Sequence, residues 1–419
     1  MSAETVSSHF LSGKSVFVIG AGLSGSAFVA SLRSTWDHYF PFPELAVFDR
    51  DPKNTFERRG GYSLSLVGND ISGGLVALNK MGLLDAVLRN AIAGVGGDGS
   101  FKLWTSHWKE LASHRRSPLD GIPASSIRIA RKEIRQILLE AAQLDHDGAM
   151  FWNTQCVSVS KLRTGRLAIG TIRGDESEVR MVECDLVIVA DGANSKIRDH
   201  LRPTDRLRYT GAVLRTAVSR FSGPLPESIG SDWGFILSGT GTSCFMSPVA
   251  ENELQWAVGH FEDQTSTEIC DVEHAKRVVE RALELGSHFA EPFKTILSQT
   301  VPDTVMCINA HDKLPFRHSE IGTLPVVFIG DANHALSPFA GYGANLGLSD
   351  AWDLAEQLTK GDSLAEAVAA YDSISFPRAT KVVTGARQRL RAGHSTGLRY
   401  LAFLVMLVIS NALRRVFGR

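Results

Sequence analysis

One stretch near the start of the chain, Ser15 to Leu32, constrains the fold more than any other. Its residues Val16 to Ile19 are continuously apolar, as in a strand that is buried on both faces of a sheet. The pattern Gly20-x-Gly22-x-x-Gly25 follows at once and leads into a helical segment. In such a strand-turn-helix the first glycine allows a tight turn, the second admits a pyrophosphate, and the third lets helix and strand pack closely.

A second apolar strand, Leu45 to Phe48, ends in Asp49 and Arg50. Asp49 lies roughly twenty residues beyond the glycine turn, where a carboxylate can accept hydrogen bonds from ribose hydroxyls. A purely structural glycine turn is the alternative interpretation. The order of strand, turn, helix and carboxylate favours dinucleotide binding, with Asp49 and Arg50 as candidate cofactor residues.

Length and composition permit two or three domains, because 419 residues with 44% hydrophobic side chains can bury a large core. The net charge of −1 is not that of a polyanion-binding protein, so nucleic acid is not an expected partner. The five cysteines form no CxxC pair, which argues against a zinc site or a disulfide framework. With no signal-peptide pattern at the N-terminus, we expect a cytoplasmic protein.

Two further apolar strands end in aspartate and glycine. Leu186 to Ala190 runs into Asp191-Gly192, and Val326 to Ile329 runs into Gly330-Asp331. The carboxyl ends of parallel strands are where open α/β folds bind ligands. Arg131 stands where a short strand meets a helix, so it is either a cation for a nucleotide or a surface arginine.

A second glycine-rich loop precedes a helix that runs through Leu358. Its candidate cofactor-binding residues are Pro338, Gly341, Gly343, Ala344 and Asn345. Two such turns, far apart in the sequence, suit the two ends of one extended dinucleotide.

Residues 204–263 contain strand-like segments separated by Gly, Pro and Ser, without a helical period. This pattern predicts a mostly antiparallel sheet with one face open to an apolar ligand. The candidate substrate residues are Phe235, Phe245, Gln255 and Trp256, together with Phe339 from the loop. The alternative is that these aromatic side chains only fill the core.

We therefore expect an α/β fold in which a discontinuous Rossmann-like domain of the GxGxxG type, residues 1–72, 112–203 and 298–395, binds the dinucleotide. Residues 73–111 and 204–297 form the substrate domain and residues 396–419 a C-terminal helix. The chain has no Asp or Glu after residue 372 but nine Lys or Arg. Tyr400 to Ile409 is apolar on all sides but shorter than the roughly 20 residues that span a bilayer. The tail either packs against its own domains or lies on a membrane surface.

In these motifs the chain resembles the class A flavoprotein monooxygenases of the p-hydroxybenzoate hydroxylase fold, from about Ser15 to Arg391. The resemblance implies that the glycine turn and Asp49 hold the adenosine half of FAD, and that Arg131 contacts FAD. It also implies that Asp191-Gly192 serves both FAD and NAD(P)H, and that Asp331 holds the flavin ribityl chain. The segments GGYSLSL, IARKEIRQILL and SPFAGYGANLGLSDAWDLA are most similar to the tetracycline-oxidising monooxygenases, whereas the substrate sheet lacks the polar contacts that those enzymes make to their antibiotic.

The family reaction is that NAD(P)H, here expected to be NADPH, reduces FAD, and that O₂ then forms a C4a-hydroperoxyflavin. One oxygen atom hydroxylates or epoxidises an apolar or aromatic small molecule, here expected to be a natural-product intermediate. The helix start at Gly341 to Asn345 would stabilise the reduced flavin anion. The flavin carries the chemistry, so no catalytic side chain and no metal ligand is named. A flavin-dependent reductase or dehydrogenase of the same fold is the alternative, and a monomer is expected.

Overall fold

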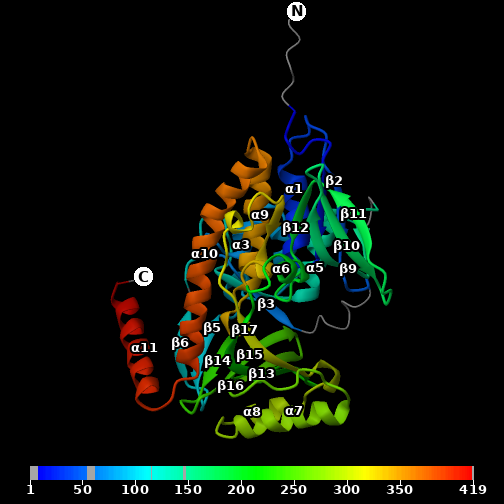
Figure 1. Cartoon of the computed structure of the whole chain (residues 1–419). Coiled ribbons are helices and arrows are strands. Elements are labelled where there is room, and N and C mark those ends of the chain that lie inside the picture. Colours follow the sequence, from blue (N-terminus) through cyan, green and yellow to red (C-terminus); the bar gives the residue numbers. More distant parts are fainter. Residues whose placement is uncertain (1–7, 54–61, 115, 145–147, 418–419) are drawn as a thin grey trace, which may run out of the picture.

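The computed structural model describes residues 8–53, 62–114, 116–144 and 148–417 (Figure 1). Its central sheet has five parallel strands in the order β18-β12-β1-β2-β8. Their bounds are β1 Ser15–Ile19, β2 Glu44–Phe48, β8 Met150–Phe151, β12 Leu186–Val189 and β18 Val326–Phe328. The four apolar runs recognised in the sequence correspond to β1, β2, β12 and β18, which are consecutive in the sheet, so their carboxyl ends lie side by side.

The side chains of β1 alternate between two hydrophobic layers. Val16 and Val18 pack among helices, whereas Phe17 and Ile19 pack against a small antiparallel sheet. The main helices are α1 Leu23–Thr35, α3 Gly74–Lys80, α4 Leu84–Arg89, α5 Arg131–Ala142, α9 Gly343–Lys360 and α10 Leu364–Gly393. The small sheet consists of β9 Thr154–Lys161, β10 Leu167–Arg173 and β11 Arg180–Cys184.

A second, larger sheet forms the lower half of the molecule in Figure 1 and has the strand order β17-β13-β16-β15-β14-β5-β6. Its bounds are β5 Phe101–Thr105, β6 Glu110–His114, β13 Arg208–Arg220, β14 Trp233–Leu237, β15 Thr242–Ala250, β16 Glu253–Phe261 and β17 Met306–Asp312. All neighbouring pairs are antiparallel except β5 with β14. Helices α7 Val272–Leu285 and α8 Phe293–Ser298 cover one face.

A three-stranded sheet lies between these two parts. It contains β3 Ser63–Val67, β7 Ser126–Ala130 and β4 Ala91–Ala93, with β7 in the middle. All three strands contact β15 of the large sheet. The expected fold class, a dinucleotide-binding α/β domain with a mostly antiparallel second domain, is confirmed.

The hydrophobic clusters divide the chain differently from the expected domain boundaries at two places. Helices α3 and α4, within residues 73–111, belong to the helical layer of the central sheet because Leu75, Leu78 and Val87 pack in its core. Strand β17, within residues 298–395, belongs to the large sheet because it pairs with β13.

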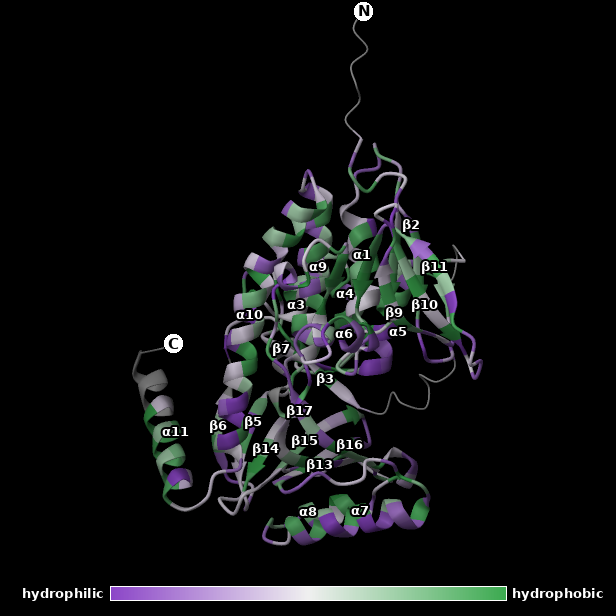
Figure 2. Cartoon of the chain, viewed as in Figure 1, coloured by the Kyte–Doolittle hydropathy of each residue, from purple (hydrophilic) through white to green (hydrophobic). Residues whose placement is uncertain are grey.

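Helix α11, Gly397–Phe417, stands beside β6 and the end of α10 at the edge of the molecule (Figure 1). Figure 2 shows that most of this helix is hydrophobic. In the part of the chain that the structure describes, no helix combines the length and the hydropathy needed to cross a membrane.

Candidate active site

The turn between β1 and α1 uses its three glycines in three different ways. Gly20 has a φ of 103°, and a Cβ there would lie 2.4 Å from the Ala190 carbonyl oxygen. A Cβ at Gly25 would lie 1.9 Å from the carbonyl oxygen of Gly20. At Gly22, by contrast, a Cβ would meet no described atom within 4 Å. Gly20 and Gly25 therefore serve the turn itself, while Gly22 leaves room for a ligand.

Helix α1 begins at this open position without a side-chain cap and without an acidic residue in its first turn. Its first N–H groups are therefore available to an anion such as a pyrophosphate.

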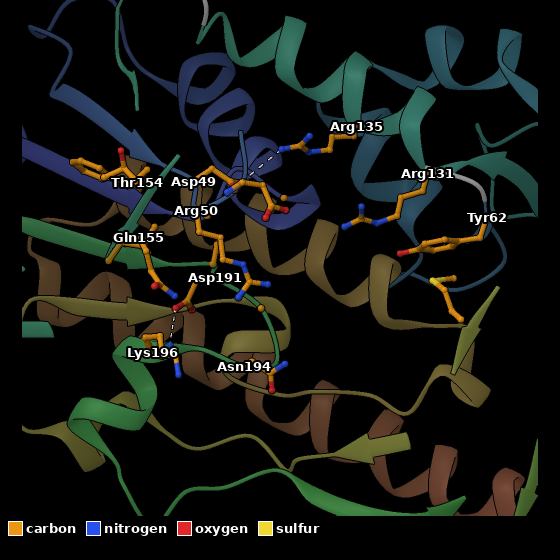
Figure 3. Close-up of a pocket in the computed structure, with 18 of the residues that line it drawn as sticks. Asp49, Arg50, Tyr62, Arg131, Arg135, Thr154, Gln155, Asp191, Asn194 and Lys196 are labelled. Carbon is orange, nitrogen blue, oxygen red and sulfur yellow. Dashed lines mark hydrogen bonds and ion pairs between the residues drawn. The ribbon is translucent and has the colours of Figure 1, made fainter. Parts of the chain in front are cut away.

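A cleft of about 560 Å³ lies where β1, β2 and β12 end (Figure 3). Predicted cofactor residues that line it are Gly20, Gly22, Asp49, Arg50, Arg131, Asp191 and Gly192. Further lining residues that the sequence did not single out are Tyr62, Arg135, Thr154, Gln155, Asn194 and Lys196. The cleft thus collects side chains from both sheet domains around the glycine turn.

Asp49 holds the glycine turn in place as well as facing the cleft. Its carboxylate accepts hydrogen bonds from the backbone N–H groups of Ala21 at 2.8 Å and Asp51 at 2.9 Å. Burial raises the pKa of Asp49, and these hydrogen bonds oppose the rise. Arg135 donates to the Ala21 carbonyl at 2.8 Å and lies 3.7 Å from the Asp49 carboxylate. Arg135 comes four residues after Arg131 and therefore lies on the same side of α5, so the sequence spacing could have indicated it as a site residue.

Asp191 has one carboxylate oxygen engaged and one free. Oδ2 accepts a hydrogen bond from the Lys196 N–H at 3.0 Å, whereas Oδ1 is buried without a partner among the described residues. Burial raises the pKa of Asp191 to about 6. Arg50 extends from the end of β2 toward Asp191 across the cleft (Figure 3). Oδ1 can accept a hydrogen bond from a hydroxyl group of a bound nucleotide.

Asp331 follows β18 in the short 3₁₀ helix η4, Gly330–Ala332. No hydrogen bond or ion pair joins its carboxylate to another described residue, and burial raises its pKa. A Cβ at Gly343 would lie 3.8 Å from Asp331 Oδ1, so the carboxylate faces the start of α9. An unpaired carboxylate in this place fits the hydroxyls of a ribityl chain.

Helices α1 and α9 approach each other closely at Ser24. A Cβ at Gly330 or at Gly347 would lie 2.4 Å or 2.3 Å from the Ser24 hydroxyl oxygen. The sequence analysis did not identify this contact, which sets the spacing between the two helix starts.

The start of α9 has no side-chain cap and no acidic residue in its first turn. Asn345 is fully buried, and its Oδ1 accepts hydrogen bonds from the N–H groups of Val67 and Gly74, both at 2.8 Å. Its Nδ2 donates to the Ser65 carbonyl at 2.9 Å. The Asn345 side chain therefore anchors α9 to β3, and at this position only the backbone is left to face a cofactor. Pro338 opens the 3₁₀ helix η5, Pro338–Ala340, which Gly341 ends with a φ of 61°; Ala344 packs at the edge of the helical core.

Phe235 and Phe245 lie together on the face of the large sheet that is turned toward α10. Their ring centroids are 5.1 Å apart and both side chains are partly exposed. Phe339 belongs to the same cluster, where its ring packs over Gly259 and lies 5.1 Å from the ring of His394. The loop that leads into α9 is thus packed directly on this aromatic face.

Gln255 and Trp256 leave β16 on opposite sides, as neighbours in a strand do. Gln255 lines the cleft, and its Oε1 is buried without a described partner. Trp256 is fully buried beneath α7 and α8 and donates to the Thr300 hydroxyl at 3.1 Å. The structure therefore does not bring Trp256 together with Phe235 and Phe245, because the register of β16 turns it into the other core.

Fold and cleft together define a dinucleotide-binding α/β protein with an attached sheet domain. The family described as FAD binding domain matches residues 75–386. Monooxygenase cfoF of Aspergillus candidus is 37% identical over 394 residues, which cover 93% of this chain and 94% of the relative. The chain therefore belongs to the FAD binding domain family, and it is an FAD-dependent monooxygenase.

Solved structures share the fold at low sequence identity. HpxO of Klebsiella pneumoniae, solved with FAD and uric acid, aligns with a TM-score of 0.76 at 18% identity, covering 95% of this chain and 94% of HpxO. Tetracycline destructase Tet(55) aligns with a TM-score of 0.68 at 17% identity, covering 96% of both chains. The class recognised from the sequence motifs is confirmed.

Proposed function

We propose that the protein uses NAD(P)H, with NADPH as the expected donor, and O₂ to insert one oxygen atom into an apolar or aromatic small molecule. One observation carries the proposal: the uncapped start of α9 follows a loop that packs, through Phe339, on the partly exposed Phe235–Phe245 face. An electrostatically positive helix start beside an apolar face suits the ring end of FAD and an aromatic substrate.

Bound FAD supplies the electron transfer and the activation of oxygen. The start of α1 binds the pyrophosphate. Asp49 and Asp331 accept hydrogen bonds from hydroxyl groups of the cofactor. Arg131 lies beside them, with its Cζ 5.7 Å from the centroid of the Tyr62 ring. The N–H groups at the start of α9 stabilise negative charge at the ring end. Phe235 and Phe245 keep water from the reacting atoms.

We expect the substrate to be an aromatic natural-product intermediate that is hydroxylated or epoxidised. The structural relatives support a ring compound, since one was solved with uric acid and another is named a tetracycline destructase.

The test is a screen of NADPH and NADH consumption against aromatic and terpenoid compounds, followed by turnover under ¹⁸O₂. One heavy oxygen atom per product, with one nicotinamide consumed when coupling is complete, supports the proposal. Equal product formation without oxygen contradicts it and favours a flavin-dependent reductase.

We also propose that α11 lies on an anionic membrane surface. Its large apolar residues that are more than half exposed are Leu398, Leu401, Val405, Met406, Val408 and Ile409. They recur with helical spacing on the side turned away from the body, and such a stripe marks an interaction surface. The absence of Asp and Glu after residue 372 makes the segment basic, which complements anionic lipid.

Vesicle sedimentation with phosphatidylcholine, with and without phosphatidylglycerol, tests this attachment. Replacing Leu401, Val405 and Ile409 with serine should abolish binding to the anionic vesicles without unfolding the protein. The control is Ile71→Ser, which changes an exposed residue elsewhere. Insolubility after deletion of residues 397–419, or a triple variant that binds vesicles normally, contradicts the proposal.

A further inference from the structure

Arg128 in β7 is the one buried arginine of the described residues that lacks an acidic partner. Arg128 is only 3% exposed to solvent. The other buried arginines, Arg135, Arg198 and Arg215, each have a carboxylate oxygen within 4 Å. Among the described residues, no carboxylate lies within that distance of Arg128.

The contacts of Arg128 are all neutral. Its guanidinium donates to the Ser65 hydroxyl at 2.8 Å and to the Ser63 carbonyl at 2.7 Å. Its Nε is buried without a described partner, and its Cζ lies 5.4 Å from the centroid of the Phe245 ring. The buried Nε–H and the positive charge are therefore left without a described partner.

A lone buried cation is energetically costly. Burial lowers the pKa of Arg128 to about 9, which still leaves the guanidinium charged at neutral pH. An unpaired buried charge costs several kcal/mol unless a counter-ion joins it. An anion that binds beside such a group removes this cost and therefore stabilises the folded protein.

The position of Arg128 indicates which ligand supplies that anion. The Ser65 hydroxyl accepts a hydrogen bond from Arg128, and the Ser65 carbonyl accepts one from Asn345 Nδ2 at the start of α9. Arg128 also lies over the ring of Phe245, which in turn pairs with the ring of Phe235. Arg128 is thus linked through Ser65 to the helix start assigned to the flavin ring, and it directly contacts the aromatic face assigned to the substrate.

We propose that Arg128 binds an anionic oxygen of the substrate, so that the enzyme selects ring compounds carrying a carboxylate, phenolate or enolate. This assignment rests on the proposed function and narrows its substrate class. The Nε–H and the guanidinium charge recognise the oxygen, and Phe245 and Phe235 contact the ring.

The experiment titrates the FAD-loaded enzyme with benzoate and with benzamide, which have the same shape but differ in charge. Flavin absorbance and the thermal unfolding midpoint report binding. Benzoate should bind at least tenfold more tightly than benzamide. Arg128→Met should remove this preference without changing benzamide binding, Arg128→Lys should retain part of it, and Arg173→Met on the exposed end of β10 should leave it unchanged.

Three results would overturn the assignment. The first is equal binding of the two probes, or no binding of benzoate, by the unmodified enzyme, a comparison that does not depend on the folding of any variant. The second is an Arg128→Met enzyme that unfolds at a lower temperature but keeps the benzoate preference, which makes Arg128 a structural clamp. The third is a changed flavin reduction potential with an unchanged preference, which assigns the charge to the reduced flavin.

The proposed function is judged separately from this assignment. Oxygen-dependent NAD(P)H oxidation without a benzoate preference refutes the role of Arg128 alone. Turnover that does not depend on oxygen refutes the monooxygenase reaction itself.

Discussion

Asp331 differs from the other carboxylates of the site because no described residue donates a hydrogen bond to it. Asp49 accepts two backbone N–H groups and Asp191 accepts one, whereas Asp331 has no described hydrogen-bond partner. Its role is therefore separable from the stability of the apoprotein.

Asp331→Ala should weaken FAD binding by about tenfold to a hundredfold, since a hydrogen bond to a charged group contributes roughly 1.5 to 3 kcal/mol. The apoprotein should be at least as stable as the unmodified protein at neutral pH, because the substitution removes no described hydrogen bond and removes a carboxylate whose pKa is raised by burial. Fluorescence titration of FAD and urea unfolding measure the two effects. The exposed Asp362, after α9, provides the control variant Asp362→Ala. Equal FAD affinity in both variants would remove Asp331 from the site.

The raised pKa of Asp191 predicts a pH dependence of stability. Between the unfolded pKa of 3.8 and the folded pKa of about 6, the folded apoprotein binds more protons than the unfolded chain. Its free energy of unfolding therefore falls as the pH rises through this interval. In Asp191→Asn that fall should be smaller by roughly 2 kcal/mol. Urea unfolding of both apoproteins between pH 4 and pH 7 measures it, and parallel curves would contradict it.

At the scale of elements, different glycines of the β1–α1 turn serve folding and cofactor binding. Gly25→Ala places a Cβ against the Gly20 carbonyl and should destabilise the protein by roughly 1 to 3 kcal/mol. Gly22→Ala meets no described atom and has a φ of −73°, so the apoprotein should keep its stability. Its added methyl group nevertheless occupies the approach of the pyrophosphate, and FAD binding should weaken at least tenfold.

Thermal unfolding of the apoproteins and FAD titration distinguish the two variants. A loss of stability in Gly22→Ala equal to that in Gly25→Ala would show that both glycines serve only the turn.

Strand β16 shows how an element can be predicted while its faces are not. The sequence located a strand around Gln255 and Trp256, and both lie in β16. The pairing of β16 with β15 and β13 decides that Gln255 faces the cleft and Trp256 the core under α7 and α8. A sheet buried on both faces has apolar residues on either side, so the pattern alone does not distinguish them.

At the scale of the whole molecule, the cofactor site joins distant parts of the chain. Gly22 and Asp49 lie at one end, and Asp331 and the start of α9 at the other. Bound FAD should therefore stabilise the complete fold, by about 2.7 kcal/mol when free FAD is a hundredfold above its Kd. Riboflavin, which lacks the adenosine and pyrophosphate that reach Gly22 and Asp49, should stabilise it far less.

Unfolding midpoints with each flavin provide the measurement, and equal stabilisation by riboflavin would contradict binding at the β1–α1 turn. Acid precipitation should release the flavin into solution, since we expect no covalent attachment. Flavin that stays with the precipitate would contradict this expectation.

The sequence by itself determined the parts of this protein that depend on neighbours along the chain. The glycine turn, the four apolar strands and the aspartates that follow three of them are local patterns, because glycine geometry and hydrophobic runs act over a few residues. The monomeric state and the absence of a nucleic-acid partner stay predictions.

Only the tertiary structure decided which groups meet across the sheets. It placed β17 in the large sheet, turned Trp256 away from the aromatic face and left Arg128 buried with no described carboxylate within 4 Å. Each outcome depends on strand register and on charges carried by residues far away in the sequence. A local pattern does not contain that information, because burial and pairing arise only when the layers pack together.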